Sequence, residues 1–125
     1  MTENDISFEI VTAAINLHKN LGPGLLESVY EHALAYDLRK LGLNVHQQKP
    51  MPFYYQDVVL DVGYKLDLLV EGKVLIEVKS VSEISKIHKA QILTYLRLSK
   101  LKLGLLINFN VVMLKDGLHR YANNL

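Results

Sequence analysis

The chain opens with two stretches in which apolar residues recur at helical spacing. The first stretch predicts a helix that Asn4 or Asp5 can cap and that Gly22-Pro23-Gly24 ends. Its expected buried face carries Ile6, Ile10, Ala13, Leu17 and Leu21. A second helix is predicted over about residues 25–41, with Gly42 just beyond its C-terminal end. The apolar positions expected on it are Leu26, Val29, Ala33 and Tyr36, with Leu34, Leu38 and Leu41 widening the stripe.

The middle of the chain changes to the short apolar runs that are typical of strands. Extended segments are predicted over 44–48 and 51–55, where Pro50 and Pro52 indicate a sheet edge, and over 58–62 after a turn at Gln56-Asp57. The runs 64–70 and 73–79 are almost continuously apolar, which predicts strands that are buried on both faces. They are the clearest strand patterns in the sequence.

A third helix is predicted over about residues 83–100, and a strand over 103–109 follows it. One stripe of this helix carries Ile84, Ile87, Gln91, Tyr95 and Leu98. A strand, a crossover helix and a second strand of these lengths predict parallel pairing of 73–79 with 103–109. Segments 111–114 and 118–121 resemble a terminal hairpin. The pattern predicts an α/β fold, with a mixed sheet flanked by helices in one domain over residues 1–125.

Composition narrows the function classes. The 125 residues include 14 basic and 13 acidic ones, so the chain does not have the strong positive charge of a protein that coats nucleic acid by charge alone. It contains no cysteine, which excludes disulfides and thiolate metal sites and fits a reducing cytoplasm. The polar start lacks the pattern of a signal peptide, and no apolar run approaches the ~20 residues that span a bilayer. We therefore expect a cytoplasmic protein without a membrane partner.

Asp67, Glu77 and Lys79 are the most informative residues, because they interrupt the two apolar strands. A buried charge is costly unless it has a partner or a function. If Glu71-Gly72 alone forms the turn, the two acids point to opposite faces. If the connection is 71–73, or a bulge lies near Asp67, they face one another, and we predict one of these two arrangements.

Facing carboxylates suit Mg²⁺, and Lys79 lies on the same face as Glu77. Such a set can hydrolyse phosphodiesters. The alternative is that both acids sit in solvent at strand ends and that Lys79 pairs with one of them.

Two further pairs have a structural and a functional interpretation. Glu27 falls in the first turn of the second helix, where an acid stabilises the helix dipole, with Tyr30 one turn later. It can instead be a third acidic ligand. Gln91 and Tyr95 lie one turn apart on the third helix, either half-exposed at the edge of its stripe or directed at the carboxylates.

The segment LGPGLLESVYEHAL resembles the hallmark of the GxxExxY proteins, with Gly24, Glu27 and Tyr30 at the named positions. The segments GYKLDLLVEGKVLIEVKSV, KAQILTYL and LGLLINFNVVMLKDGLHR resemble that family in the same order. That family is similar to the PD-(D/E)XK nuclease superfamily, which implies a restriction-endonuclease-like core. The resemblance places Asp67 at the first acidic position and Glu77 with Lys79 in the E-x-K motif.

The resemblance also places Glu27 at the acidic position of the preceding helix, with Gly24 and Tyr30 as supporting residues, and Gln91 with Tyr95 in the Q-x-x-x-Y feature of the RecB-like branch. It implies a nuclease that uses Mg²⁺ or Mn²⁺ to hydrolyse phosphodiester bonds of DNA or RNA. The alternative is a catalytically silent module of the same fold that binds nucleic acid or a protein partner. A homodimer or a larger complex is compatible with both.

Overall fold

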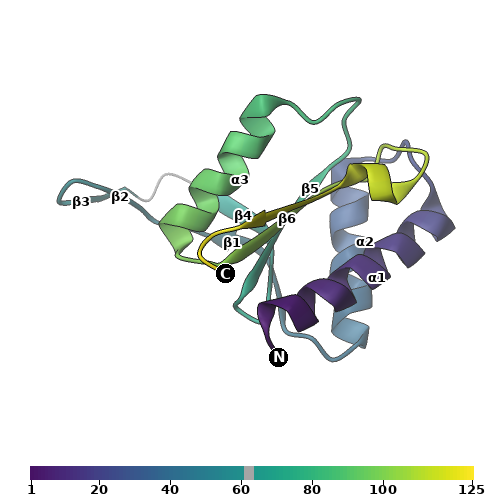
Figure 1. Ribbon diagram of the computed structural model, residues 1–125, viewed down its shortest axis with the longest axis horizontal. Helices are drawn as coiled ribbons and strands as arrows, with labels where there is room; N and C mark the ends of the chain where they lie inside the picture. The colour runs from purple at the N-terminus through teal and green to yellow at the C-terminus, as the bar shows by residue number, and fades with distance from the viewer. Residues whose placement is uncertain (61–63) are drawn as a thin grey trace.

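A mixed β-sheet with helices on both faces forms the body of the protein (Figure 1). The computed structural model describes residues 1–60 and 64–125. The helices are α1 (Glu3–Leu21), α2 (Glu27–Lys40) and α3 (Lys86–Ser99), with a 3₁₀ turn η1 (Leu114–Gly117). The strands are β1 (Val45–Pro50), β2 (Phe53–Tyr55), β3 (Val58–Leu60), β4 (Lys65–Val70), β5 (Val74–Lys79), β6 (Leu103–Asn108) and β7 (Leu118–Ala122).

Among the described residues, five strands form the main sheet in the order β1-β4-β5-β6-β7. Strand β1 lies at its edge, as Pro50 and Pro52 predict. The predicted parallel pairing of β5 with β6 is confirmed, and the other neighbouring pairs are antiparallel. This α/β architecture agrees with the predicted restriction-endonuclease-like core.

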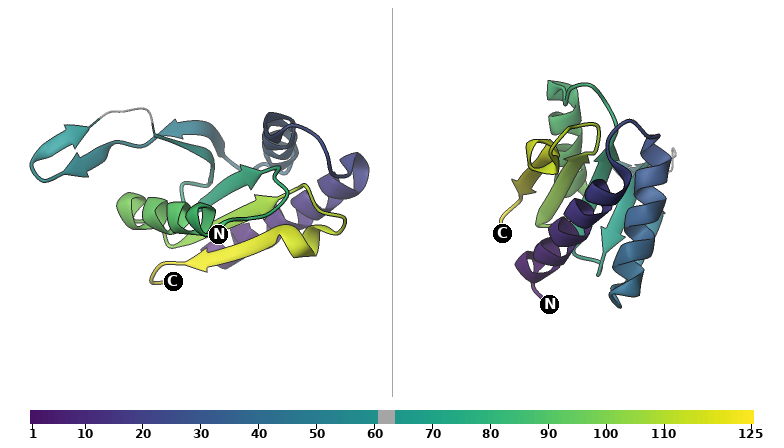
Figure 2. Two further views of the ribbon diagram at one scale, coloured as in Figure 1. Left: turned by 90° about the horizontal axis from the view of Figure 1, so that it is seen from above. Right: turned by 90° about the vertical axis from the view of Figure 1, so that its right-hand side faces the viewer.

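Helices α1 and α2 cover one face of the sheet and α3 covers the other (Figure 2). Side chains of β5 alternate between the two faces, so that Ile76 and Val78 meet α1 and α2 while Leu75 meets α3. The cluster of apolar side chains under α1 and α2 is the larger one, and α1 and α2 also bury Ser7, His18 and Glu31. Stability therefore rests mainly on that face.

Thr2, rather than Asn4 or Asp5, caps α1. The Thr2 hydroxyl accepts from the Asp5 N–H, and the Asp5 carboxylate accepts from the Thr2 N–H, forming a capping box. The prediction placed Asn4 or Asp5 at the cap, whereas Asp5 is the acid of the box three residues after Thr2. At the end of α2, Gly42 has φ +85° as predicted, and the Leu43 N–H donates to the Leu38 carbonyl.

The buried face of α2 differs from the predicted one. Leu26, Val29 and Tyr36 are exposed, and so is Leu41. The stripe that packs on the sheet consists of Tyr30, Glu31, Leu34, Ala35 and Leu38, so the predicted places of Leu34 and Leu38 are confirmed. The error arises because α2 has apolar residues on both faces, so helical periodicity alone fits two stripes.

The buried face of α3 is also rotated from the prediction. Ile92, Tyr95 and Leu96 are buried, whereas Ile87 is exposed. The helix begins with a capping box between Ser85 and His88, a few residues later than predicted. Tyr95 keeps its predicted place on the face that meets the sheet.

The predicted terminal hairpin is wrong. Residues 111–113 are not a strand, Leu114–Gly117 is η1, and β7 pairs with β6 instead. The open edge of β6 gives β7 a backbone ladder that a small isolated hairpin lacks. The predicted strand over 58–62 is seen as β3, and its last two residues lie outside the described part of the chain.

Strands β2 and β3 form a separate hairpin that projects from the body (Figure 1, Figure 2). Its turn contains Gln56 with φ +52°. At its root, the Met51 N–H donates to the Tyr64 carbonyl over 2.8 Å. This pair attaches the hairpin to the body beside β4.

Candidate active site

The sheet divides at the position of Asp67 and Glu77. Strand β4 pairs with β1 as far as Pro50 and Lys65, but its pairing with β5 ends at Leu68 and Ile76. Strand β5 keeps pairing with β6 as far as Lys79 and Asn108. Strands β4 and β5 therefore separate while each keeps its other neighbour, and we call the point of separation, with Asp67 and Glu77, the fork.

The register of the β4–β5 hairpin follows the three-residue alternative. Val70 pairs with Val74 and Leu68 with Ile76, so the connection is residues 71–73. Glu71 and Gly72 adopt left-handed conformations, with φ +53° and +64°. Continuing this register brings Asp67 opposite Glu77.

The Asp67 carboxylate takes over hydrogen bonds where the backbone ladder ends. Its Oδ2 accepts from the Val78 N–H at 2.9 Å, and its Oδ1 accepts from Gln48 Nε2 at 3.3 Å. Gln48 has φ +51°, which interrupts β1 at the same level of the sheet. Asp67 is therefore fixed between β1 and β5.

Glu77 is a buried acid, with only 4% of its surface exposed. Its Oε1 has no hydrogen-bond partner among the described residues. Burial raises the pKa of the Glu77 carboxyl to about 9, and the charge and hydrogen bond of Asp67 add to the rise. A cation brought to the fork would favour the ionised carboxylate, so that the proton would leave to solvent.

Lys79 follows two residues after Glu77 on the same strand, and its charge lowers the pKa of the Glu77 carboxyl, against the larger effect of burial. The side chain is half-buried. The structure therefore places Asp67 beside Glu77, and it places the Lys79 amine of the predicted E-x-K spacing close enough to act on the Glu77 carboxyl through its charge. The solvent-exposed alternative for Glu77 is wrong.

Helix α3 brings Tyr95 and Gln91 to the face of the sheet that carries Glu77 and Lys79. Burial raises the pKa of the Tyr95 hydroxyl to about 12, and the charges of Glu77 and Asp67 add to the rise. A hydrogen bond from Gln91 has the opposite effect on that pKa. The Tyr95 hydroxyl thus stays protonated near the carboxylates at neutral pH, as a donor.

Tyr30 and Gly24 shape the loop before α2. The Tyr30 hydroxyl donates to the Gly22 carbonyl at 2.6 Å and accepts from the Leu25 N–H at 3.1 Å, and its ring stacks on Phe109 at 4.6 Å. Gly24 adopts φ +94°, which favours glycine. Both residues hold the loop, and the Tyr30 hydroxyl is occupied by backbone groups rather than by a carboxylate.

Glu27 is the first residue of α2, and it is exposed. The loop before it reaches the end of β5, because Ser80 Oγ donates to the Leu25 carbonyl at 2.6 Å. Across residues 1–60 and 64–125, however, no three or more acids or histidines are grouped to hold a metal ion. The predicted trio of Glu27, Asp67 and Glu77 is therefore not assembled.

Glu31, one turn after Glu27, is the acid that the sequence analysis missed. It is buried, and its Oε1 accepts from Gln48 Nε2 at 2.6 Å, the same nitrogen that reaches Asp67. Burial and the charge of Asp67 raise the pKa of the Glu31 carboxyl. Glu31 lies on the same helical stripe as Leu34, Ala35 and Leu38. Its position among these apolar residues would have identified it once that stripe was chosen as the buried face of α2.

The donor set at the fork fits a divalent cation of the Mg²⁺ type. Such an ion is bound by oxygen, commonly by one or two carboxylates with several waters. Asp67 and Glu77 supply two carboxylates, and Glu77 Oε1 is a buried oxygen without a partner among the described residues. Both acids therefore have acceptor capacity for an ion.

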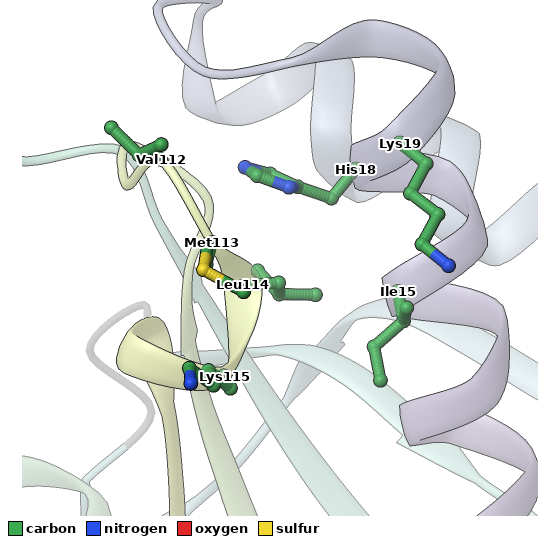
Figure 3. A pocket seen from close by; sticks show the side chains of 7 residues that line it. All are labelled: Ile15, His18, Lys19, Val112, Met113, Leu114 and Lys115. Atoms are coloured by element: carbon green, nitrogen blue, oxygen red, sulfur yellow. The ribbon is translucent and has the colours of Figure 1, made fainter.

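A pocket on the other face of the sheet has different chemistry. It lies between α1 and the segment after β6, with a volume of about 230 Å³ (Figure 3). Its lining consists of Ile15, His18, Lys19, Val112, Met113, Leu114 and Lys115. None of these is a carboxylate, so this pocket offers no hard oxygen side-chain ligand.

A family model described as the PD-(D/E)XK nuclease superfamily matches residues 4–121, and the chain belongs to that superfamily. Neither the comparison with curated proteins nor the comparison with solved structures finds a match. Membership indicates a nuclease-type function, contact with nucleic acid and a general dependence on divalent metal. Along the described residues, no helix is long and apolar enough to cross a membrane.

Proposed function

We propose that this protein is a nuclease that uses Mg²⁺ or Mn²⁺ to hydrolyse phosphodiester bonds of DNA or RNA at the fork. The pair of buried Glu77 and half-buried Asp67 carries the proposal, because an acid pair of this kind is costly in a protein that does not use it. We also assign the chain to the GxxExxY group, on the segment with Gly24 and Glu27, and to the RecB-like branch.

Asp67 and Glu77 would hold the cation, and Val78 and Gln48 fix the orientation of Asp67. The bound cation would supply positive charge that screens the phosphate and lowers the pKa of a water. Lys79 lies on the same face of β5 and is available to orient the attacking water. Its ammonium also offsets negative charge that develops on the phosphate during attack.

Gln91 and Tyr95 act from α3 as orienting groups. The Tyr95 hydroxyl remains protonated because the pKa of that group is about 12, so it can donate to a carboxylate or to a phosphate oxygen. Gln91 hydrogen-bonds the hydroxyl and limits its direction. Their part in the reaction is to hold the acids and the phosphate in one arrangement.

We place Glu31, rather than Glu27, as the α2 acid that acts on the fork. It reaches Asp67 through Gln48 and adds negative charge beside the cation. The loop before Glu27 contacts the residue that follows β5, through Ser80 and Leu25. A direct role for Glu27 as a ligand requires that it move inward when metal and substrate bind.

A catalytically silent module that binds nucleic acid or a protein is the second candidate. The observation in its favour is that no group of three acids or histidines is arranged for a metal within the described residues. An assay that records both cleavage and binding of nucleic acid separates the two functions. Labelled single-stranded, duplex and branched DNA, and RNA, are incubated with the protein in Mg²⁺ or Mn²⁺.

We expect wild-type protein to cleave at least one of these substrates, and Glu77→Gln to bind it without cleaving. Lys79→Met is the second inactive variant, because it removes the amine and keeps much of the apolar stem. Binding without cleavage by the wild-type protein, with both metals and all substrates, would assign the chain to the silent class.

A further inference from the structure

A pocket of about 320 Å³ opens on the α3 face of the protein. Its lining consists of Tyr64, Ile87, Ala90, Gln91, Thr94 and Tyr95. Gln91 and Tyr95 are the residues that α3 presents to the fork, and Tyr64 is at the root of the β2–β3 hairpin. An occupant of this pocket would therefore lie between the carboxylates and the hairpin.

Aromatic rings lie in the pocket and on the projecting hairpin, and Tyr95 is the buried one of these rings. The rings of Tyr64 and Tyr95 meet edge-on, with centroids 5.7 Å apart, and Tyr64 is 41% exposed. On the projecting hairpin, Tyr54 and Tyr55 are 69% and 61% exposed. Exposed tyrosines are suited to stacking against nucleobases, because every base has a flat aromatic face.

Exposed lysines at the root of the hairpin and at the start of α3 are suited to a phosphate backbone, and Asp57 is an exposed acid at the hairpin turn. Lys49 and Lys65 are exposed where β1 and β4 leave for the hairpin, and Lys86 is exposed at the start of α3. The pocket itself has polar groups, from Gln91 and Thr94, that can bond the edge of a base. Its volume is at the low end of the roughly 300–1,000 Å³ of small-molecule pockets, which suits one base rather than a larger group.

We propose that this surface binds single-stranded nucleic acid, with one unpaired base in the pocket against Tyr64 and with the strand continuing along the hairpin tyrosines. The inference rests on the proposed nuclease function, and it names the substrate class of the same site. In a duplex the bases are paired and stacked, so they reach such a pocket only by extrusion. A single strand presents its bases at no such cost, and its phosphate would then lie beside Asp67 and Glu77.

The test is binding without cleavage, measured in EDTA by fluorescence anisotropy. The probes are a fluorescein-labelled oligothymidylate and a blunt duplex of the same length. We expect the wild-type protein to prefer the single strand at least tenfold. We expect Tyr64→Leu in the pocket, and the double substitution Tyr54→Ser with Tyr55→Ser on the hairpin, each to weaken single-strand binding about tenfold.

Tyr36→Ser is the matched control, because Tyr36 on α2 is as exposed as Tyr55 but lies on the other face of the sheet. It should change the affinity less than twofold. Equal affinity for the two probes, or equal effects of the pocket, hairpin and control substitutions, would overturn the proposal. So would a protein dimer in sedimentation that the hairpin substitutions dissociate, because a second copy would then occupy this surface.

The two proposals fail in distinguishable ways. If the wild-type protein binds the oligothymidylate selectively but cleaves nothing with Mg²⁺ or Mn²⁺, the proposed catalysis fails and the binding surface stands. If it cleaves nucleic acid but binds single strand and duplex equally in EDTA, the surface fails and the catalysis stands.

Discussion

The two faces of the central sheet differ in what they bury. Under α1 and α2 the sheet presents a continuous apolar cluster that includes Ile76 and Val78. Under α3 a smaller apolar cluster around Leu75 lies beside Glu77 and Lys79, which come from the same strand. The α1 and α2 face thus supplies most of the apolar burial, and Glu31 is the acid that α2 buries there. The α3 face holds Glu77 and Lys79, which cost stability, and this indicates that the polar groups are kept for a function.

Adjacent substitutions on β5 separate the two faces most strongly. Glu77→Gln should lower the cleavage rate by more than about 100-fold, because even the outer partners of metal ligands cost 10–100-fold. Ile76→Ala should instead lower the free energy of unfolding by about 2–5 kcal/mol, through the cavity that it leaves. Initial cleavage rates and urea unfolding measure the two effects. If Glu77→Gln destabilised the fold as much as Ile76→Ala, the acid would be part of the core.

The pH dependence of stability tests the α3 face without substrate. The pKa of the Glu77 carboxyl rises from 4.5 to about 9 on folding, so between these values the folded protein holds a proton that the unfolded chain has lost. In the absence of metal, the contribution of Glu77 to the free energy of unfolding should therefore be greatest below pH 4.5. It should fall as the pH rises towards about 9. The loss is on the order of a few kcal/mol.

Urea midpoints measured in EDTA across this pH window check the prediction, and Glu77→Gln is the control, since it cannot titrate. In the variant, most of the decline in stability with rising pH should be absent. Parallel profiles for the two proteins would show that Glu77 does not carry a buried proton.

The fold was predictable from the sequence where the signals are local. The aliphatic runs of β4 and β5 predict their own strands, and Gly72 with its left-handed conformation favours the three-residue connection that aligns Asp67 with Glu77. The acids stand out because they interrupt these runs. The core of the site was therefore accessible to periodicity and turn chemistry alone.

The missed features depend on packing between distant segments. Helix α2 has apolar residues on both sides, so only its contact with the sheet decides that Glu31 is buried and that Leu26 is exposed. The bridge from Glu31 through Gln48 to Asp67 joins three separate elements. No spacing in the sequence encodes such a bridge. The sequence of β7 likewise does not specify which open sheet edge the strand pairs with, and the structure pairs it with β6.

Removing the Tyr95 hydroxyl should lower the cleavage rate by less than removing the Glu77 carboxylate. Tyr95→Phe should lower the cleavage rate about 10–100-fold, as expected for a group that orients metal ligands. Tyr121→Phe is the control, because Tyr121 packs against the same apolar cluster from β7. It should change the rate little, and both variants should unfold within about 1 kcal/mol of the wild type. Equal rates for the two variants would remove Tyr95 from the site.

Glu31 and Glu27, one turn apart on α2, provide the comparison with the smallest expected effect. Glu31→Gln should weaken Mn²⁺ binding several-fold in calorimetry, because it removes negative charge that acts on Asp67. Glu27→Gln should leave the affinity within about twofold, since exposed charges interact weakly through water. The reverse order would mean that Glu27 moves to the fork when the metal binds.

Anomalous scattering from crystals that contain Mn²⁺ tests the central claim most directly. An ion at the fork should give a peak that lies about 2.0–2.6 Å from a carboxylate oxygen of both Asp67 and Glu77, the range for oxygen ligands of such cations. The peak should vanish in Asp67→Asn crystals. A fork without an ion at millimolar Mn²⁺, or a peak that persists in Asp67→Asn, would contradict the assignment of these two acids as the metal centre.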